Sequence, residues 1–90
     1  MPIERNFEIV NEKGLHARAS ARFVETVEQF DASVYVTRDG NTTSGDSIMG
    51  LLMLAASKGT NIAVKTDGVQ AEALADALQE LISNRFGEDG

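Results

Sequence analysis

Cysteine and tryptophan are absent from this 90-residue chain, which contains only one proline and one histidine. Without cysteine the chain can form no disulfide, thiolate zinc site or cysteine nucleophile. No stretch approaches the roughly 20 apolar residues that a bilayer-spanning helix needs, and the first ten residues lack the basic segment and apolar run of a signal peptide. We therefore expect a cytoplasmic protein with no membrane insertion.

Positive charge is also scarce. Eight Lys and Arg residues stand against 14 Asp and Glu residues, which gives a formal net charge of -6. Because the basic residues are scattered along the chain, we expect no nucleic-acid binding and no attachment to an anionic membrane. The chain is long enough for one compact core but not for a deep enclosed pocket. We expect one domain over residues 1–90, as a monomer.

Alternation of apolar and polar residues predicts the strands, as in the segment Ile3 to Ile9. Asp39-Gly40 is a residue pair favoured in tight hairpins, so the segments before and after it are predicted to pair. A second Asp-Gly pair follows the last predicted strand. The predicted strands are residues 3–9, 33–38, 41–44 and 61–66.

Apolar residues at intervals of three and four predict three helices. The first runs from about Ala17 to Phe30-Asp31. The second covers residues 47–56, with Lys58-Gly59 as its stop signal. The third begins at Ala71 and continues the helical spacing to Phe86. The acidic tail of residues 87–90 is expected to fray.

The predicted order is β-α-β-β-α-β-α. Half-buried strands that alternate with amphipathic helices favour two layers. We therefore predict an α+β fold in which a four-stranded antiparallel sheet carries three helices on one face. No internal repeat indicates a solenoid.

The single histidine lies between the first predicted strand and the first predicted helix. A helix that begins near Ala17 leaves its first backbone N–H groups unpaired, those of Ala17 and Arg18 included, and these groups attract anions. The Arg18 guanidinium can donate to phosphoryl oxygens. Phosphoryl transfer asks for little beyond positioning and charge stabilisation. His16 is therefore a candidate phosphoryl acceptor.

Other interpretations of this segment stay open. His16 can act only as a helix cap, and Arg18 can pair with a carboxylate such as Glu8 or Glu12. A metal site is not expected, because one histidine without cysteine would need a set of carboxylates that no spacing gathers. Ser20 lies one turn from His16, but no nucleophile-elbow pattern accompanies it, so a serine hydrolase is not expected.

The run Gly14-Leu15-His16-Ala17-Arg18, followed by Ser47-Ile48-Met49-Gly50 and Lys58-Gly59, resembles the histidine-containing phosphocarrier protein family, HPr, of bacterial phosphotransferase systems. The resemblance covers essentially the whole chain and implies an open-faced β-sandwich. It implies that Enzyme I, phosphorylated by phosphoenolpyruvate, phosphorylates His16 at Nδ1, and that the group passes to an Enzyme IIA protein or domain. Arg18 would be its electrostatic partner. The family uses no cofactor and carries the phosphoryl group rather than turning over a substrate as an enzyme.

The resemblance also gives Ser47 a role as a regulatory serine, which in some bacteria is phosphorylated by HPr kinase. Spacing alone favours a different role, in which Ser47, Ser44 or Asp46 caps the second helix. The two roles can coexist, since a phosphate at Ser47 would put about two negative charges beside a docking surface.

An apolar patch beside His16 is the docking surface that the resemblance implies. Methionine suits repeated docking because its side chain adapts its shape, although residues at this helical spacing can also belong to the core. The predicted docking residues are Leu15, Ile48, Met49 and Leu52.

Two departures from the commoner HPr pattern bear on the branch of the family. Ala19 stands where proline is more usual, and Asp46 adds negative charge where sugar-transport members often carry lysines. The acidic character, together with Phe30-Asp31-Ala32, Leu51-Leu52-Met53-Leu54 and the acidic tail that contains Phe86, also resembles the nitrogen-related branch, NPr, and the sequence does not decide between the two. A binding module without transfer remains a rival and predicts that His16→Ala leaves function intact. A small enzyme would turn over a diffusible substrate without protein partners.

Overall fold

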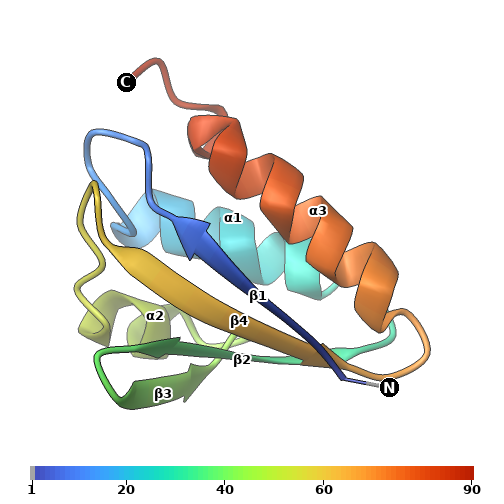
Figure 1. The fold of residues 1–90 in the computed structure, drawn as a ribbon. Helices are drawn as coiled ribbons and strands as arrows, with labels where there is room; N and C mark the ends of the chain where they lie inside the picture. Colours follow the sequence, from blue (N-terminus) through green and yellow to red (C-terminus); the bar gives the residue numbers. More distant parts are fainter. Residues whose placement is uncertain (1) are drawn as a thin grey trace.

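The computed structural model describes residues 2–90 and consists of a four-stranded antiparallel sheet with helices on one side (Figure 1). The strand order across the sheet is β1-β4-β2-β3. Along the chain the elements are β1 (Ile3–Glu8), α1 (Ala17–Val27), β2 (Ser33–Arg38), β3 (Asn41–Ser44), α2 (Ile48–Met53), β4 (Asn61–Asp67), α3 (Ala71–Ser83) and a final 3-10 turn (Arg85–Gly87). The predicted fold and element order are confirmed.

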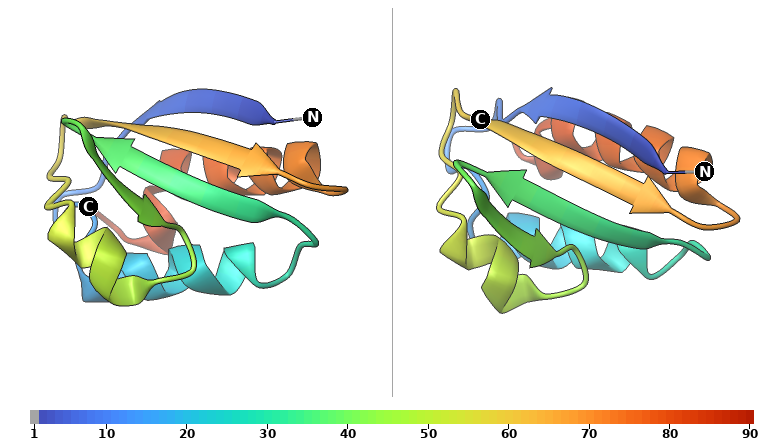
Figure 2. Two further views of the ribbon diagram at one scale, coloured as in Figure 1. Left: turned by 90° about the horizontal axis from the view of Figure 1, so that it is seen from below. Right: turned by 60° about the horizontal axis from the view of Figure 1, so that its bottom comes forward.

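The core lies between the sheet and the helices. In the sheet Phe7 pairs with Ile62, and Val36 pairs with Val64. These four side chains are at most 8% exposed, because alternate residues of each strand point towards the helical layer. The views in Figure 2 show α1 and α3 beneath one face of the sheet while the other face stays uncovered. Tyr35, on β2, is 53% exposed.

The hairpin between β2 and β3 turns at Asp39-Gly40. Both residues have positive φ, 50° and 79°. Two consecutive left-handed residues match the right-handed twist of the paired strands, and a short polar residue followed by glycine adopts them most readily. The predicted hairpin is confirmed, and its strands pair from Arg38 and Asn41 to Tyr35 and Ser44.

Two helices end earlier than the periodicity predicts. Helix α1 ends at Val27 rather than near Phe30, because the Phe30 N–H turns back to the Val27 carbonyl at 3.2 Å. Helix α2 ends at Met53, and Ala55 then adopts a positive φ of 52°. The prediction that Lys58-Gly59 stops this helix is wrong, because those two residues lie in the following turn, where the Gly59 N–H donates to the Ile9 carbonyl at 2.7 Å.

The chain reverses sharply after α3. The helix ends at Ser83, so the prediction that Phe86 belongs to it is wrong. Arg85, Phe86 and Gly87 all have positive φ, of 57°, 54° and 78°. Phe86 is nevertheless fully buried, since the reversed chain inserts its ring into the core. Within residues 2–90 no helix has the length and apolar character to cross a bilayer.

Candidate functional site

The loop before α1 is fixed by close backbone contacts with Ala56. Gly14 has a φ of 65°, and a Cβ atom there would lie 2.6 Å from the Ala56 carbonyl oxygen. The Leu15 N–H donates to that same oxygen at 2.8 Å. Leu15 is only 4% exposed and belongs to the core. The loop therefore delivers the next residue, His16, to the first turn of α1 in a fixed orientation.

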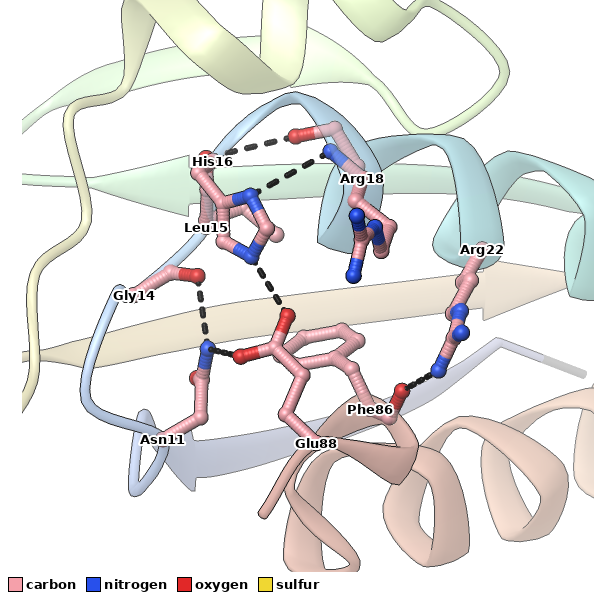
Figure 3. A network of polar contacts seen from close by, with 9 residues as sticks. Asn11, Gly14, Leu15, His16, Arg18, Arg22, Phe86 and Glu88 are labelled. Carbon is pink, nitrogen blue, oxygen red and sulfur yellow. Dashed lines mark hydrogen bonds and ion pairs between the residues drawn. The ribbon is translucent and has the colours of Figure 1, made fainter. Parts of the chain in front are cut away.

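His16 is the N-cap of α1. Its backbone is extended, with φ -79° and ψ -175°, and its Nδ1 accepts from the Arg18 N–H at 3.3 Å. Its carbonyl accepts the first helical hydrogen bond, from Ser20, at 2.8 Å. The side chain is 27% exposed, so the ring is neither sealed in the core nor free in solution. Capping occurs, and it directs Nδ1 towards the N-terminus of the helix (Figure 3).

The opposite nitrogen of the ring contacts the C-terminal segment. His16 Nε2 pairs with Glu88 Oε2, and the other Glu88 oxygen accepts from Asn11 Nδ2 at 3.0 Å. Burial by itself raises the pKa of the Glu88 carboxyl. Hydrogen bonds from Asn11 and His16, together with the charges of His16 and Lys13, outweigh burial and place this pKa below its ordinary value of 4.5. Glu88 is therefore held as a carboxylate beside the ring.

Arg18 is exposed on the first turn of α1. Its guanidinium forms no ion pair within residues 2–90, and Glu12 pairs instead with Lys58 at 3.3 Å. The expected alternative in which Arg18 is tied to Glu8 or Glu12 is therefore not found. Arg18 borders a hollow of about 360 Å³ that Arg22 and Glu88 also line, so its guanidinium is available to an anion near His16.

Backbone donors at the start of α1 are available as well. Of the first three N–H groups only that of Arg18 has an acceptor within residues 2–90, and that acceptor is His16 Nδ1. The N–H groups of Ala17 and Ala19 are left for an outside acceptor, as is usual at a helix start. The site thus combines a ring nitrogen, backbone donors and a guanidinium. Among residues 2–90, the site included, no group of three or more His, Asp or Glu side chains is placed to hold a metal ion.

Helix α2 carries the second set of predicted residues. Ser47 is its N-cap, and Ser47 Oγ accepts from the Gly50 N–H at 3.0 Å. Ser44 Oγ donates to Asp46 Oδ1 at 2.7 Å instead of capping the helix. The capping role predicted for Ser47 is present.

The predicted docking residues differ in exposure. Ile48 is 40% exposed and Met49 is 69% exposed. Leu52 is half-buried and lines a hollow of about 270 Å³ together with His16 and Ala55. The structure places Leu15 beneath this hollow with 4% exposure, so its side chain offers a partner little surface.

Sequence reasoning missed two residues that contact the site, Asn11 and Glu88. Asn11 is fully buried, and its Nδ2 also donates to the Gly14 carbonyl at 2.8 Å. The sequence predicts that residues 87–90 fray, which indicates no role for Glu88. The helical spacing of Phe86 was the one available signal that this part of the chain is anchored to the core.

Comparisons with known proteins agree with this arrangement. Residues 3–84 match the family described as the PTS HPr component phosphorylation site. Phosphocarrier protein HPr of Neisseria meningitidis is 48% identical over 86 residues, which is 96% of this chain and 97% of the relative. Phosphocarrier protein NPr of Escherichia coli is 36% identical over 90 residues, which is 99% of this chain and 100% of the relative.

A solved structure agrees as well. The crystal structure of HPr from Thermoanaerobacter tengcongensis superposes with a TM-score of 0.93 at 36% identity, covering 98% of this chain and 99% of that one. The named relatives are phosphocarriers rather than catalytic enzymes, and both HPr and NPr are among them. The chain belongs to the HPr family and is a phosphocarrier protein of the phosphotransferase system.

Proposed function

We propose that His16 is the phosphoryl acceptor and that Nδ1 is the atom that forms the bond to phosphorus. The observation that carries the proposal is the direction of the ring: Nδ1 faces the N-terminus of α1, while Nε2 faces Glu88. The 3.3 Å contact from the Arg18 N–H is long for a hydrogen bond, so Nδ1 can exchange it for a bond to phosphorus at little cost.

The groups around Nδ1 suit the charge of a phosphoryl group. As the bond to phosphorus forms, the Arg18 N–H is released from Nδ1 and can donate to a phosphoryl oxygen, together with the Ala17 N–H. The positive end of the α1 dipole stabilises the same negative charge. The exposed Arg18 guanidinium adds donors that move with the phosphoryl group during transfer.

Enzyme I is the donor and an Enzyme IIA protein or domain is the acceptor in this proposal. Both partners would dock on the apolar patch formed by Ile48, Met49 and Leu52. The support is position: Leu52 and His16 line the same hollow, and the two neighbouring apolar side chains are exposed on α2. Exposed methionine adapts to partners of different shape. The proposal places the exchange in the cytoplasm, with this chain acting as a monomer.

Phosphorylation of Ser47 is proposed as a brake on the exchange. The hydroxyl caps α2 immediately before Ile48 and Met49, so a phosphate there would place about two negative charges at the edge of the patch. Ser47→Asp carries part of this charge. Its transfer rate from Enzyme I should fall below that of Ser47→Asn, which keeps a capping side chain without charge. Equal rates in the two variants would count against the brake.

The direct test of the proposal is incubation with Enzyme I and radiolabelled phosphoenolpyruvate, followed by mapping of the labelled residue. Acid-labile, base-stable label on His16 is expected, and His16→Ala should take none. Arg18→Ala should be labelled more slowly, while Lys65→Ala, which removes an exposed positive charge from β4, serves as the control. Stable transfer of label to a residue other than His16 would overturn the proposal.

A further inference from the structure

The C-terminal turn brings a carboxylate to Nε2 of His16, the ring nitrogen on the other side from the proposed phosphoryl site. Three successive residues with positive φ reverse the chain after α3. Phe86 anchors the reversal: its ring is fully buried, and its carbonyl accepts from Arg22 Nη1 of α1. Because both its ring and its carbonyl are held, the next-but-one residue, Glu88, is placed with its carboxylate against Nε2 of His16 (Figure 3).

Glu88 is held there from two directions. Its Oε2 contacts His16 Nε2, and its Oε1 accepts from Asn11 Nδ2 at 3.0 Å. Asn11 is fully buried, and the same Nδ2 donates to the Gly14 carbonyl at 2.8 Å, so this amide can present only N–H groups to Glu88. The Glu88 side chain is 13% exposed. The position of this carboxylate is therefore specific, because each of its two oxygens faces a defined partner, Asn11 Nδ2 or His16 Nε2.

We infer that Glu88 is a positioning residue for phosphoryl transfer at His16, an inference that rests on the proposed function. A carboxylate is purely an acceptor, so the nitrogen that faces it must carry the proton. His16 Nε2 is therefore the N–H of the neutral ring, and Nδ1 keeps its lone pair at the helix start. The geometry thus selects both the tautomer and the atom that reacts.

The same carboxylate also balances charge during the reaction. The Nδ1 lone pair forms the bond to phosphorus, and the bond between phosphorus and the donor breaks, with its electron pair leaving on the donor. The imidazole, which keeps its Nε2 proton, thereby acquires a positive charge beside the Glu88 carboxylate. On transfer to the next protein the bond between Nδ1 and phosphorus breaks, its electron pair returns to Nδ1, and the ring is neutral again. The logic is that of the aspartate in a Ser-His-Asp triad, which holds the histidine tautomer and stabilises the cation.

Glu88→Gln is the sharpest perturbation, because the surrounding hydrogen bonds dictate its orientation. Asn11 Nδ2 must still find an acceptor, so the new amide oxygen is expected to face Asn11. The amide NH₂ group then faces His16 Nε2. Because this group only donates, Nε2 must accept a hydrogen bond and cannot carry the ring proton. In this arrangement the ring proton moves to Nδ1, where it opposes the Arg18 N–H and occupies the reactive lone pair.

Asp89→Asn is the matched control. It neutralises the neighbouring carboxylate in the same tail with the same change of shape, and Asp89 is exposed and makes no hydrogen bond within residues 2–90. Both variants keep Phe86 and its burial. Matching circular dichroism spectra and a cooperative thermal transition in each variant would exclude a general loss of structure, even where the midpoint of Glu88→Gln is lower.

The first measurement is the tautomer of His16, read from the ¹⁵N shifts and N–H couplings of its ring at alkaline pH, where imidazole is neutral. This reading needs no partner protein. Wild type and Asp89→Asn should show the Nε2–H form, whereas Glu88→Gln should show a substantial Nδ1–H population. The Nε2–H form at the same fraction in all three proteins would overturn the inference.

The second measurement is the single-turnover rate of label transfer from phosphorylated Enzyme I. Glu88→Gln should be slower than Asp89→Asn by at least about tenfold, the order found when the carboxylate partner of a metal-ligating histidine is removed. Label on His16 at equal rates in both variants would overturn this inference and leave the proposed function standing. A wild-type protein that takes no label on His16 would overturn both.

Discussion

Replacing Gly14 with alanine tests how closely the loop that carries His16 is fitted to the rest of the fold. The new Cβ would lie 2.6 Å from the Ala56 carbonyl oxygen and 2.8 Å from the Ser57 Cα. Both are backbone atoms, so no side-chain rotation relieves the contact. The loop at Ala56 must move away from residues 14–16, which lengthens the hydrogen bond from the Leu15 N–H.

The expected cost has two parts. A left-handed conformation costs a non-glycine residue about 1–2 kcal/mol, and Gly14 has a φ of 65°. Loss of a buried hydrogen bond that leaves its donor without an acceptor costs about 1–3 kcal/mol. Gly14→Ala should therefore lower the free energy of unfolding by about 2–5 kcal/mol, which a small domain with a stability of about 5–15 kcal/mol can survive in folded form.

Gly40→Ala is the matched control. Gly40 also has a positive φ, of 79°, but nothing lies within 4 Å of a Cβ there. Only the conformational part of the cost applies, about 1–2 kcal/mol. Urea unfolding followed by circular dichroism measures both values. Equal losses in the two variants would refute the reasoning, because the close approach to Ala56 would then have no energetic consequence.

Three further outcomes are expected. Phe86→Ala should lower the free energy of unfolding by about 3–5 kcal/mol, because a fully buried ring is removed, and it should also shift the His16 ring signals in NMR spectra as Glu88 loses its anchor. Ser47→Ala should cost about 1 kcal/mol in urea unfolding, since the Gly50 N–H loses its capping acceptor, and Ser47→Asp should recover part of that loss. The lowered pKa of Glu88 means that its carboxylate contributes stability above the ordinary value of 4.5 and loses that contribution as the pH falls through the lower folded-state value. The stability difference between wild type and Glu88→Gln, measured by urea unfolding at a series of pH values, should therefore shrink on acidification, and a difference that grows would contradict the cause assigned to the shift.

The parts of the fold that could be predicted from the sequence are those with local chemical causes. Asp39-Gly40 adopts the left-handed turn that this residue pair favours, and α1 begins at Ala17, as the change of periodicity indicates. The end of α2 could not be predicted in this way. The helix stops at Met53, before the Lys58-Gly59 signal, and Ala55 adopts the left-handed conformation that a glycine would be expected to occupy.

The histidine half of the site was predictable for the same reason, and its carboxylate half was not. His16 and Arg18 are two residues apart and share one helix start, so spacing alone brings them together. His16 and Glu88 are 72 positions apart and meet only because the chain reverses after α3. Nothing local to the last four residues indicates that reversal, since its cause is the burial of Phe86 against distant parts of the core.

The reversal also makes the two chain ends unequal as attachment points. β1 begins at Ile3, at the end of the sheet far from the carboxyl terminus in Figure 1, whereas Gly90 lines the same hollow as Arg18. A purification tag, fluorophore or fusion partner joined after Gly90 would emerge beside Arg18 and compete with incoming proteins for room. Immobilisation for binding measurements should therefore use the amino-terminal end, which leaves the reacting edge of the molecule unobstructed.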